Sequence, residues 1–283
     1  MSQEPRFGRM IPAMVTPFDE NRELDLDKAQ ALAVRLVDGG SDSLIINGTT
    51  GESPTVFYPQ KIKLFSAVVE AVGDRVPVIA NVGDNCTADT VDFARDVAKL
   101  GVDGFMCVVP YYNKPPQEGM YRHFRTIADA VELPIILYNI PGRCVVNMEA
   151  ETTLRLARDC ANIVAVKEAS GKMDQVRTII TGAPEGFAVY SGDDSATFDI
   201  MKLGALDAAY DRAVRDLEPH PRQRGIEAAG LPCGRRAPAT GRRYAGAVRA
   251  SRADHARRGS ALKHRRIAEA QHQNGRKRRA GDA

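Results

Sequence analysis

From Met10 onward, short apolar runs rich in β-branched residues alternate with longer amphipathic segments. Short apolar runs bounded by turn residues are typical of buried strands, whereas apolar positions recurring every three or four residues are typical of helices that cover one face of a sheet. The pattern predicts strands spaced by roughly one βα unit of ~30 residues, at 10–15, 43–47, 76–81, 104–109, 134–139, 162–167 and 186–191.

The amphipathic segments between these runs predict helices. We expect Thr87 to cap free backbone amides at the start of one of them, and Gly101 to end it. The predicted ranges are 25–37, 59–72, 88–100, 117–131, 149–157, 172–181 and 195–203.

This regular βα order places the chain in the α/β class and favours the (β/α)8 TIM barrel, one unit short. A doubly wound open sheet is the alternative. That fold usually carries a glycine-rich phosphate loop after its first strand, but here Thr16, Pro17 and Phe18 follow instead. We therefore predict a barrel over residues 1–205.

Composition changes abruptly after Ala205. Residues 1–205 carry a net charge of −8 and 64 residues of the types Val, Ile, Leu, Met and Phe, whereas residues 206–283 carry +11 and only 8 such residues. So few large apolar side chains cannot bury a core. We expect the second part to be a basic tail, disordered or locally helical, and not to form the barrel's eighth βα unit.

The cysteines form no CxxC pair, and their number, five, is odd. This argues against a disulfide framework and against a zinc site. Neither a secretory h-region nor an apolar run long enough to span a bilayer is present, so we expect a reduced, cytoplasmic protein without a membrane partner.

A lysine ends the sixth predicted strand, in the stretch NIVAVKEASG. In a barrel, active sites form at the carboxyl ends of the strands. Lys167 can therefore be a solvated surface amine or a desolvated nucleophile toward carbonyl compounds. Because Lys167 stands at a strand end, the residues at the other strand ends bear on the choice between these two interpretations.

Several other strand ends carry polar groups. Residues 47–53 read NGTTGES, which could bind an anion or form a capped turn. Tyr111 and Tyr112 follow the fourth strand, as packing groups or as proton donors. Tyr138 ends the fifth strand, and Arg143 five residues on could clamp a carboxylate or lie on the surface. Because these groups share one barrel edge, an imine-forming lysine with hydroxyl proton shuttles becomes the better interpretation.

The motifs GTTGES, PYYNKP, YNIPGR, VAVKEASG and SGDD, in this order, resemble those of the pyruvate-dependent class I aldolases, a family that includes N-acetylneuraminate lyase. Within it they are most similar to the dihydrodipicolinate synthase branch. The resemblance covers about residues 7–205. It implies a condensation of pyruvate with aspartate 4-semialdehyde on the route to diaminopimelate and lysine, through an imine and without a metal or other cofactor.

The resemblance also implies roles for individual residues. Lys167 would form the imine beside Tyr138. Thr49 and Tyr112 would complete a proton relay, with Tyr112 reaching into a neighbouring subunit of a homo-oligomer, either a dimer or a dimer of dimers such as a homotetramer. Further roles are substrate binding by Thr50, Arg143 and the carbonyl of Gly192, and lysine regulation by Ser53, Asn85 and Tyr111.

Arg143 separates the alternatives within the family. A semialdehyde that bears a carboxylate needs a cation, whereas the polyol chain of a sialic acid or sugar acid needs neutral hydrogen-bonding groups. We therefore favour the synthase over a lyase. For regulation we expect weak or absent inhibition by lysine, because Pro54, Tyr58 and Lys61 supply no histidine to the pocket.

The tail holds 17 arginines and 17 alanines in residues 206–283. This composition resembles a GC-rich gene translated in a shifted frame, which is our first hypothesis. A basic tail that binds nucleic acid is the rival, but an RGG repeat is missing. If the frame is shifted, the chain as written is an inactive or poorly soluble relative, and correcting the frame should restore activity.

Overall fold

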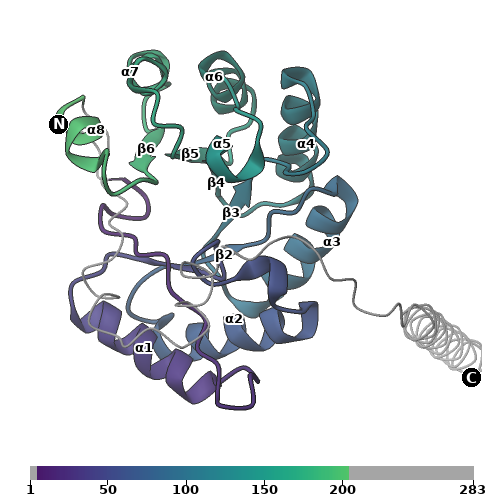
Figure 1. The fold of residues 1–283 in the computed structure, drawn as a ribbon, viewed down its shortest axis with the longest axis vertical. Helices are drawn as coiled ribbons and strands as arrows, with labels where there is room; N and C mark the ends of the chain where they lie inside the picture. The colour runs from purple at the N-terminus through teal and green to yellow at the C-terminus, as the bar shows by residue number, and fades with distance from the viewer. Residues whose placement is uncertain (1–4, 204–283) are drawn as a thin grey trace, which may run out of the picture. The chain divides into compact units, whose positions relative to one another are not determined.

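The computed structural model describes residues 5–203, and they form an open half-barrel of parallel strands with helices on its outer side (Figure 1). The strands pair in sequence order, and every recorded pair is parallel. The strands are β1 Leu44–Ile46, β2 Val78–Asn81, β3 Gly104–Val108, β4 Ile135–Asn139, β5 Ile163–Glu168 and β6 Ala188–Ser191. The predicted barrel architecture is therefore confirmed within this range.

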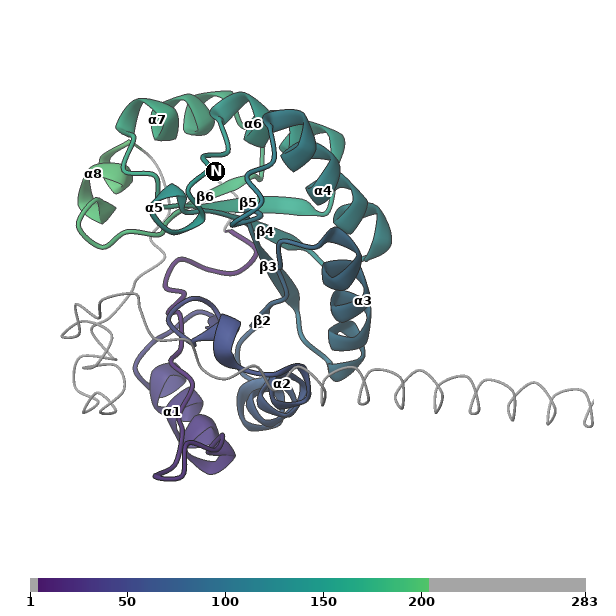
Figure 2. The same ribbon diagram turned by 45° about the vertical axis from the view of Figure 1, so that its right-hand side comes forward.

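Helices fill the connections at the predicted places, as the view in Figure 2 also shows. Two short elements, η1 and α5, add to the prediction, whereas the 3₁₀ turn η2 forms the end of the helix predicted at 88–100. The helices are α1 Leu26–Asp38, η1 Ser53–Thr55, α2 Tyr58–Val72, α3 Thr87–Val97, η2 Ala98–Leu100, α4 Gln117–Ala130, α5 Pro141–Cys144, α6 Ala150–Asp159, α7 Met173–Gly182 and α8 Thr197–Lys202.

Two apolar clusters lie on opposite faces of the sheet, because successive strand residues point to opposite sides. The larger cluster joins the helices to residues such as Leu44, Val78 and Phe105. The smaller cluster fills the inner face with the alternate residues, among them Ile45 and Ile79. Burial on both faces explains why the strands read as nearly continuous apolar runs.

The predicted first strand at 10–15 is wrong as an element. The segment makes a single parallel bridge, Ala13 to Ile45, and no longer ladder. Met14 N–H donates to Ile45 O at 2.9 Å, and Ile45 N–H donates to Pro12 O at 3.0 Å. Pro12 has no N–H to donate, so the ladder cannot extend through it. The segment still lies beside β1, where a first strand would be.

The N-terminal segment also contacts the inner face of the sheet. Tyr190 Oη donates to Gly8 O at 3.0 Å, which joins the last described strand to the start of the chain. Phe7 is buried in the inner cluster against Gly104. A Cβ on Gly104 would lie 2.5 Å from the Phe7 ring, closer than side chains approach each other. Glycine is required at the start of β3 so that Phe7 can fill this space.

The predicted cap at Thr87 is wrong, whereas the stop at Gly101 is confirmed. Helix α3 begins at Thr87 itself, and no side chain caps it. The Thr87 hydroxyl instead lies 2.8 Å from Nδ1 of the buried His123 on α4. Gly101 has φ 83° and follows η2 in the left-handed conformation that favours glycine.

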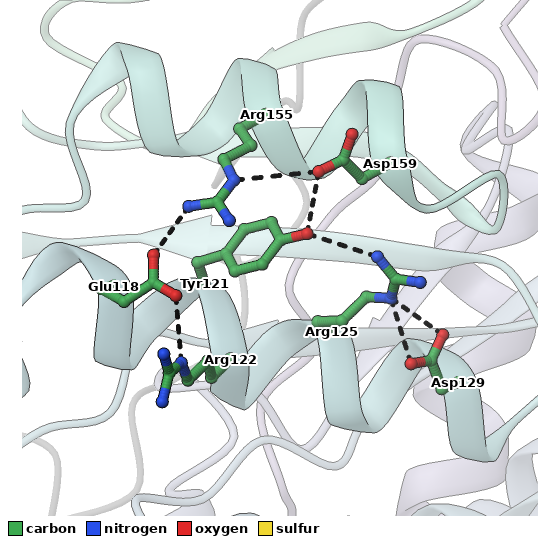
Figure 3. Close-up of polar contacts among 7 residues, drawn as sticks. All are labelled: Glu118, Tyr121, Arg122, Arg125, Asp129, Arg155 and Asp159. Atoms are coloured by element: carbon green, nitrogen blue, oxygen red, sulfur yellow. Dashed lines mark hydrogen bonds and ion pairs between the residues drawn. The ribbon is translucent and has the colours of Figure 1, made fainter.

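Helices α4 and α6 are joined on the outside by a polar cluster around Tyr121 (Figure 3). Arg155 stacks over the Tyr121 ring at 3.5 Å, and its guanidinium donates to Glu118 at 2.7 Å. The Tyr121 hydroxyl donates to Asp159 at 2.8 Å. Each of these exposed ion pairs contributes little to the free energy of unfolding. They differ in this from the buried charged groups described below.

Residues 206–283, which we expect to be a basic tail and not to form the eighth βα unit of the barrel, lie outside the described residues. The predicted domain boundary after Ala205 therefore stays a prediction.

We predict that Gly104→Ala destabilises the protein by about 1–3 kcal/mol, because the added methyl forces Phe7 out of its space. Urea unfolding followed by circular dichroism measures the change. Gly142→Ala is the matched control, since no atom lies within 4 Å of its added Cβ. Equal stability of Gly104→Ala and the parent chain would contradict the role given to Phe7.

Candidate active site

Lys167 lies in the middle of a row of three side chains that the strand register creates. Lys167 pairs with Tyr138 on β4 and with Tyr190 on β6. Both tyrosines belong to the inner cluster. Residues paired across parallel strands point to the same face of the sheet, so the amine enters the inner face between two phenols.

The Lys167 side chain is only 8% exposed, and its Nζ lies 4.9 Å from the centre of the Tyr138 ring. Burial lowers the pKa of Lys167 from 10.5 to about 8, and Asp194 opposes this shift. The cause is desolvation, which penalises the ammonium more than the neutral amine. At pH 7 roughly a tenth of Lys167 is therefore the unprotonated, nucleophilic amine, far more than for a lysine with the ordinary pKa.

Gly192 provides the space that Lys167 occupies. A Cβ at this position would lie 3.1 Å from Cγ of Lys167 and 2.9 Å from Cβ of Ala169. Any larger residue would press on the lysine side chain. The structure thus brings Lys167, Tyr138 and Gly192 together, as expected from the sequence.

Thr49 and Thr50 lie in the loop after β1. Thr49 is exposed and Thr50 half-buried. The loop is held from below, because Thr16 Oγ1 donates to Gly51 O at 2.6 Å. Gly51 approaches the backbone so closely that a Cβ would lie 2.8 Å from Cα of Asn47. This glycine is therefore needed for the tight return of the loop, which leaves both threonines at the carboxyl edge of the sheet.

Arg143 lies in the short helix α5, directly after β4, where sequence reasoning expected a turn. Its N–H donates to Ile140 O at 3.0 Å, and its side chain is exposed. Pro141 begins this helix, a position where proline needs no hydrogen bond to its nitrogen. The guanidinium is available to a ligand at the same edge of the sheet as Lys167.

Tyr112 does not share the buried row. It is 87% exposed, and its backbone has φ 72°, which is unusual for a non-glycine residue. Within residues 5–203 the side chain lies on the surface. A role in the site of its own subunit gains no support from this position.

The three residues expected to bind regulatory lysine fall into two groups. Tyr111 and Asn85 are neighbours, since Asn85 Nδ2 donates to Tyr111 O at 3.1 Å. Ser53 is instead buried, and its hydroxyl accepts from Asn47 and Asn81 at 3.2 and 3.3 Å. The expectation of weak lysine inhibition stays a prediction.

Sequence reasoning missed Glu168 and Asn139, which follow Lys167 and Tyr138 directly. Both side chains are completely buried, and the Asn139 amide donates to the Glu168 carboxylate. The signal was available, because a glutamate inside a strand of a parallel sheet is rarely buried without a purpose.

Together, the half-barrel and the strand-end amine define a protein of the βα-barrel class with a buried, partly deprotonated lysine at the carboxyl edge of its sheet. The profile of the Dihydrodipicolinate synthetase family matches residues 6–210. The chain belongs to this family, and the predicted resemblance is confirmed.

Individual relatives agree with the family match. The 4-hydroxy-tetrahydrodipicolinate synthase of Moorella thermoacetica is 57% identical over 199 residues, which are 70% of this chain and 68% of that protein. A crystal structure of the synthase from Cyanidioschyzon merolae with lysine bound is 47% identical with a TM-score of 0.72, and the match covers 73% and 70% of the two chains. A monomeric dihydrodipicolinate synthase variant is 40% identical with a TM-score of 0.69, covering 71% and 67%.

The family match ends at residue 210, close to the change in composition after Ala205. Within residues 5–203, no helix is both long enough and apolar enough to cross a membrane.

We predict that Lys167 reacts with a small neutral acylating reagent at a rate that rises with pH, is half-maximal near pH 8 and levels off roughly one pH unit higher. The reason is that the amine is the reactive form, and the lowered pKa of about 8 makes it the main form above that pH. Peptide mass spectrometry measures the rates, with the exposed Lys172 as the internal comparison. A Lys167 rate that still rises steeply between roughly pH 9 and 10 would contradict the lowered pKa.

Proposed function

We propose that this chain condenses pyruvate with L-aspartate 4-semialdehyde to 4-hydroxy-tetrahydrodipicolinate, through an imine on Lys167. The observation that carries the proposal is the buried Lys167 amine beside Tyr138, at the carboxyl edge of the sheet in a chain of this family. Its lowered pKa supplies the neutral amine that attack on a ketone needs.

The first step forms the bond between Nζ of Lys167 and the keto carbon of pyruvate. The ketone oxygen takes two protons and leaves as water, and the imine results. The positive imine nitrogen then draws electrons from the methyl carbon, which loses a proton and becomes a nucleophile. Proton transfers of this kind need hydroxyl groups close to the reacting atoms. We assign this relay to Tyr138 and Thr49, with Tyr112 of a second subunit.

In the second step, the former methyl carbon attacks the aldehyde carbon of the semialdehyde, and the aldehyde oxygen becomes a hydroxyl group. The semialdehyde's amino group then attacks the imine carbon and displaces Lys167, which closes the ring. Thr50 holds the pyruvate carboxylate and Arg143 that of the semialdehyde, while the carbonyl of Gly192 lines the pocket. The proposed reaction uses no metal ion, because the imine nitrogen is the electron sink.

The proposed proton relay requires that the chain forms a homo-oligomer. Tyr112 is 87% exposed, and it serves the relay only if it enters the site of a neighbouring subunit. A relative that has been solved is a monomeric variant, so the oligomeric state differs among such proteins. We also propose a cytoplasmic location, since the substrates are metabolites.

We predict that pyruvate followed by borohydride reduction adds a three-carbon acid to Lys167 and to no other lysine. The reduced imine is a stable secondary amine, which peptide mass spectrometry locates. Lys167→Ala should abolish the adduct, whereas Lys172→Ala, which removes an exposed lysine nearby, should leave it unchanged. Folded protein without an adduct on Lys167 would overturn the mechanism and favour an inactive relative.

Arg143→Ala should leave pyruvate trapping intact but weaken the use of the semialdehyde. Loss of a charge-assisted pair should cost on the order of 2 to 4 kcal/mol in transition-state binding. The measurement is the semialdehyde concentration that halves the trappable imine. Arg158→Ala, an exposed arginine on α6, is the matched control.

The outcome of this experiment also separates the synthase from a lyase. Equal loss of imine formation and semialdehyde use would indicate general damage. Turnover of N-acetylneuraminate without use of the semialdehyde would instead favour the lyase.

A further inference from the structure

The two residues that end β5 point to opposite faces of the sheet. Lys167 enters the inner face, beside Tyr138 and Gly192. Glu168 points to the outer side, where its contacts come from Asn139 and from Gln175 on α7. Its side chain is completely buried, although a buried carboxylate is costly unless it is well hydrogen-bonded.

Within residues 5–203, every hydrogen bond recorded to the Glu168 carboxylate comes from a neutral group. Oε1 accepts from Ser170 N–H at 2.8 Å and from Asn139 Nδ2 at 3.1 Å. Oε2 accepts from Asn139 Nδ2 at 3.1 Å and from Gln175 Nε2 at 3.2 Å. None of the ion pairs recorded among residues 5–203 includes Glu168. Both oxygens therefore face donors.

The same amides close the loop that contains Arg143. Met148 N–H donates to Asn139 Oδ1 at 3.0 Å, and Gln175 Nε2 donates to Met148 O at 3.1 Å. Asn147 Nδ2 donates to Gln175 Oε1 at 2.8 Å. The connection from the end of β4 to Met148 is thus fixed at both ends to the group around Glu168.

This arrangement connects the three site residues that come from different elements. Asn139 follows Tyr138, Glu168 follows Lys167, and residues 147 and 148 end the loop with Arg143. A displacement of about 1 Å between reacting groups can reduce a rate by a factor of roughly 100. Groups that touch no substrate can therefore control catalysis by holding those that do.

We infer that Glu168 is a positioning residue, whose carboxylate holds Lys167 on β5 in place relative to Tyr138 and the Arg143 loop through Asn139, Gln175 and Asn147. This inference rests on the proposed function, because it assigns Glu168 to the imine-forming site. It is separate from the roles given to the site residues, since Glu168 contacts the opposite side of the sheet.

The chemistry of the donors explains why a carboxylate is needed. A glutamine at 168 would have the same shape, but one side of its amide would be an NH₂ group. That NH₂ group would face either Ser170 N–H and Asn139 or Asn139 and Gln175, all of which donate. Buried donors left facing each other destabilise such a network. Glu168→Gln is therefore an almost isosteric test.

The experiment measures borohydride trapping of pyruvate on Lys167 as a time course in the full chain. We expect Glu168→Gln to lower the trapping rate constant at least about tenfold. A merely structural role would reduce the amount of folded, trappable protein but leave the rate constant of that fraction unchanged. Glu118→Gln is the matched control, because Glu118 also accepts from two side chains but lies on the surface (Figure 3).

Hydrogen–deuterium exchange supplies a second readout. Glu168→Gln should accelerate exchange in the peptide containing Met148, whose N–H bonds to Asn139, while α4 peptides stay unchanged. If Glu168→Gln does not fold, Gln175→Ala decides the matter. It removes the α7 contact from a half-buried position and should produce the same two changes to a smaller degree.

The outcomes distinguish the two proposals. A parent chain that traps pyruvate, with folded variants that trap it at the parent rate or exchange normally near Met148, would overturn the role of Glu168 alone. A folded parent chain that traps no pyruvate would overturn the proposed function and this role with it.

Discussion

The parallel register of β4, β5 and β6 is the constraint on which the candidate site depends. It places Tyr138, Lys167 and Tyr190 in one row on the inner face of the sheet. A shift by one residue would turn every side chain of a strand to the other face. Lys167 would then lie among the helices, and Glu168 would replace it in the inner cluster. The chemistry of the site is thus a consequence of strand pairing.

The same strand end carries two buried groups of opposite charge type, and the structure treats them differently. Lys167 is buried beside Tyr138 in the inner face, and this burial lowers its pKa. Glu168 is surrounded by donors that replace water. The Lys167 amine is thereby available to react, and we infer that the Glu168 carboxylate holds the end of β5 in position. Alternation along the strand separates these environments although the residues are adjacent in the chain.

The start of the chain compensates in part for the limited pairing of its first segment. A single bridge joins Ala13 to Ile45, but Phe7 fills the inner face at Gly104 and Tyr190 bonds to Gly8. These contacts connect β3 and β6 to the N-terminal segment. They allow the inner cluster to be buried even where strand hydrogen bonds are few.

Much of this protein could be read from its sequence. Alternation of apolar runs and amphipathic segments determined the order of strands and helices, and the motifs at strand ends located Lys167, Tyr138 and Arg143 at one edge. Such patterns are local, and they follow from which side chains must be buried. They also identified the family, which the match over residues 6–210 confirms.

Only the tertiary structure decided how the ends of those elements are used. Pro12 reduced an expected strand to one bridge, Thr87 turned from a cap to a partner of His123, and Glu168 became the centre of a buried network. The partners Ile45 of the N-terminal segment, His123 of Thr87 and Asn139 of Glu168 each lie about 30 residues away in the chain. Hydrogen bonds over such distances exist only once the sheet has formed, so the local pattern could mark Pro12 and Glu168 as unusual but could not specify their partners.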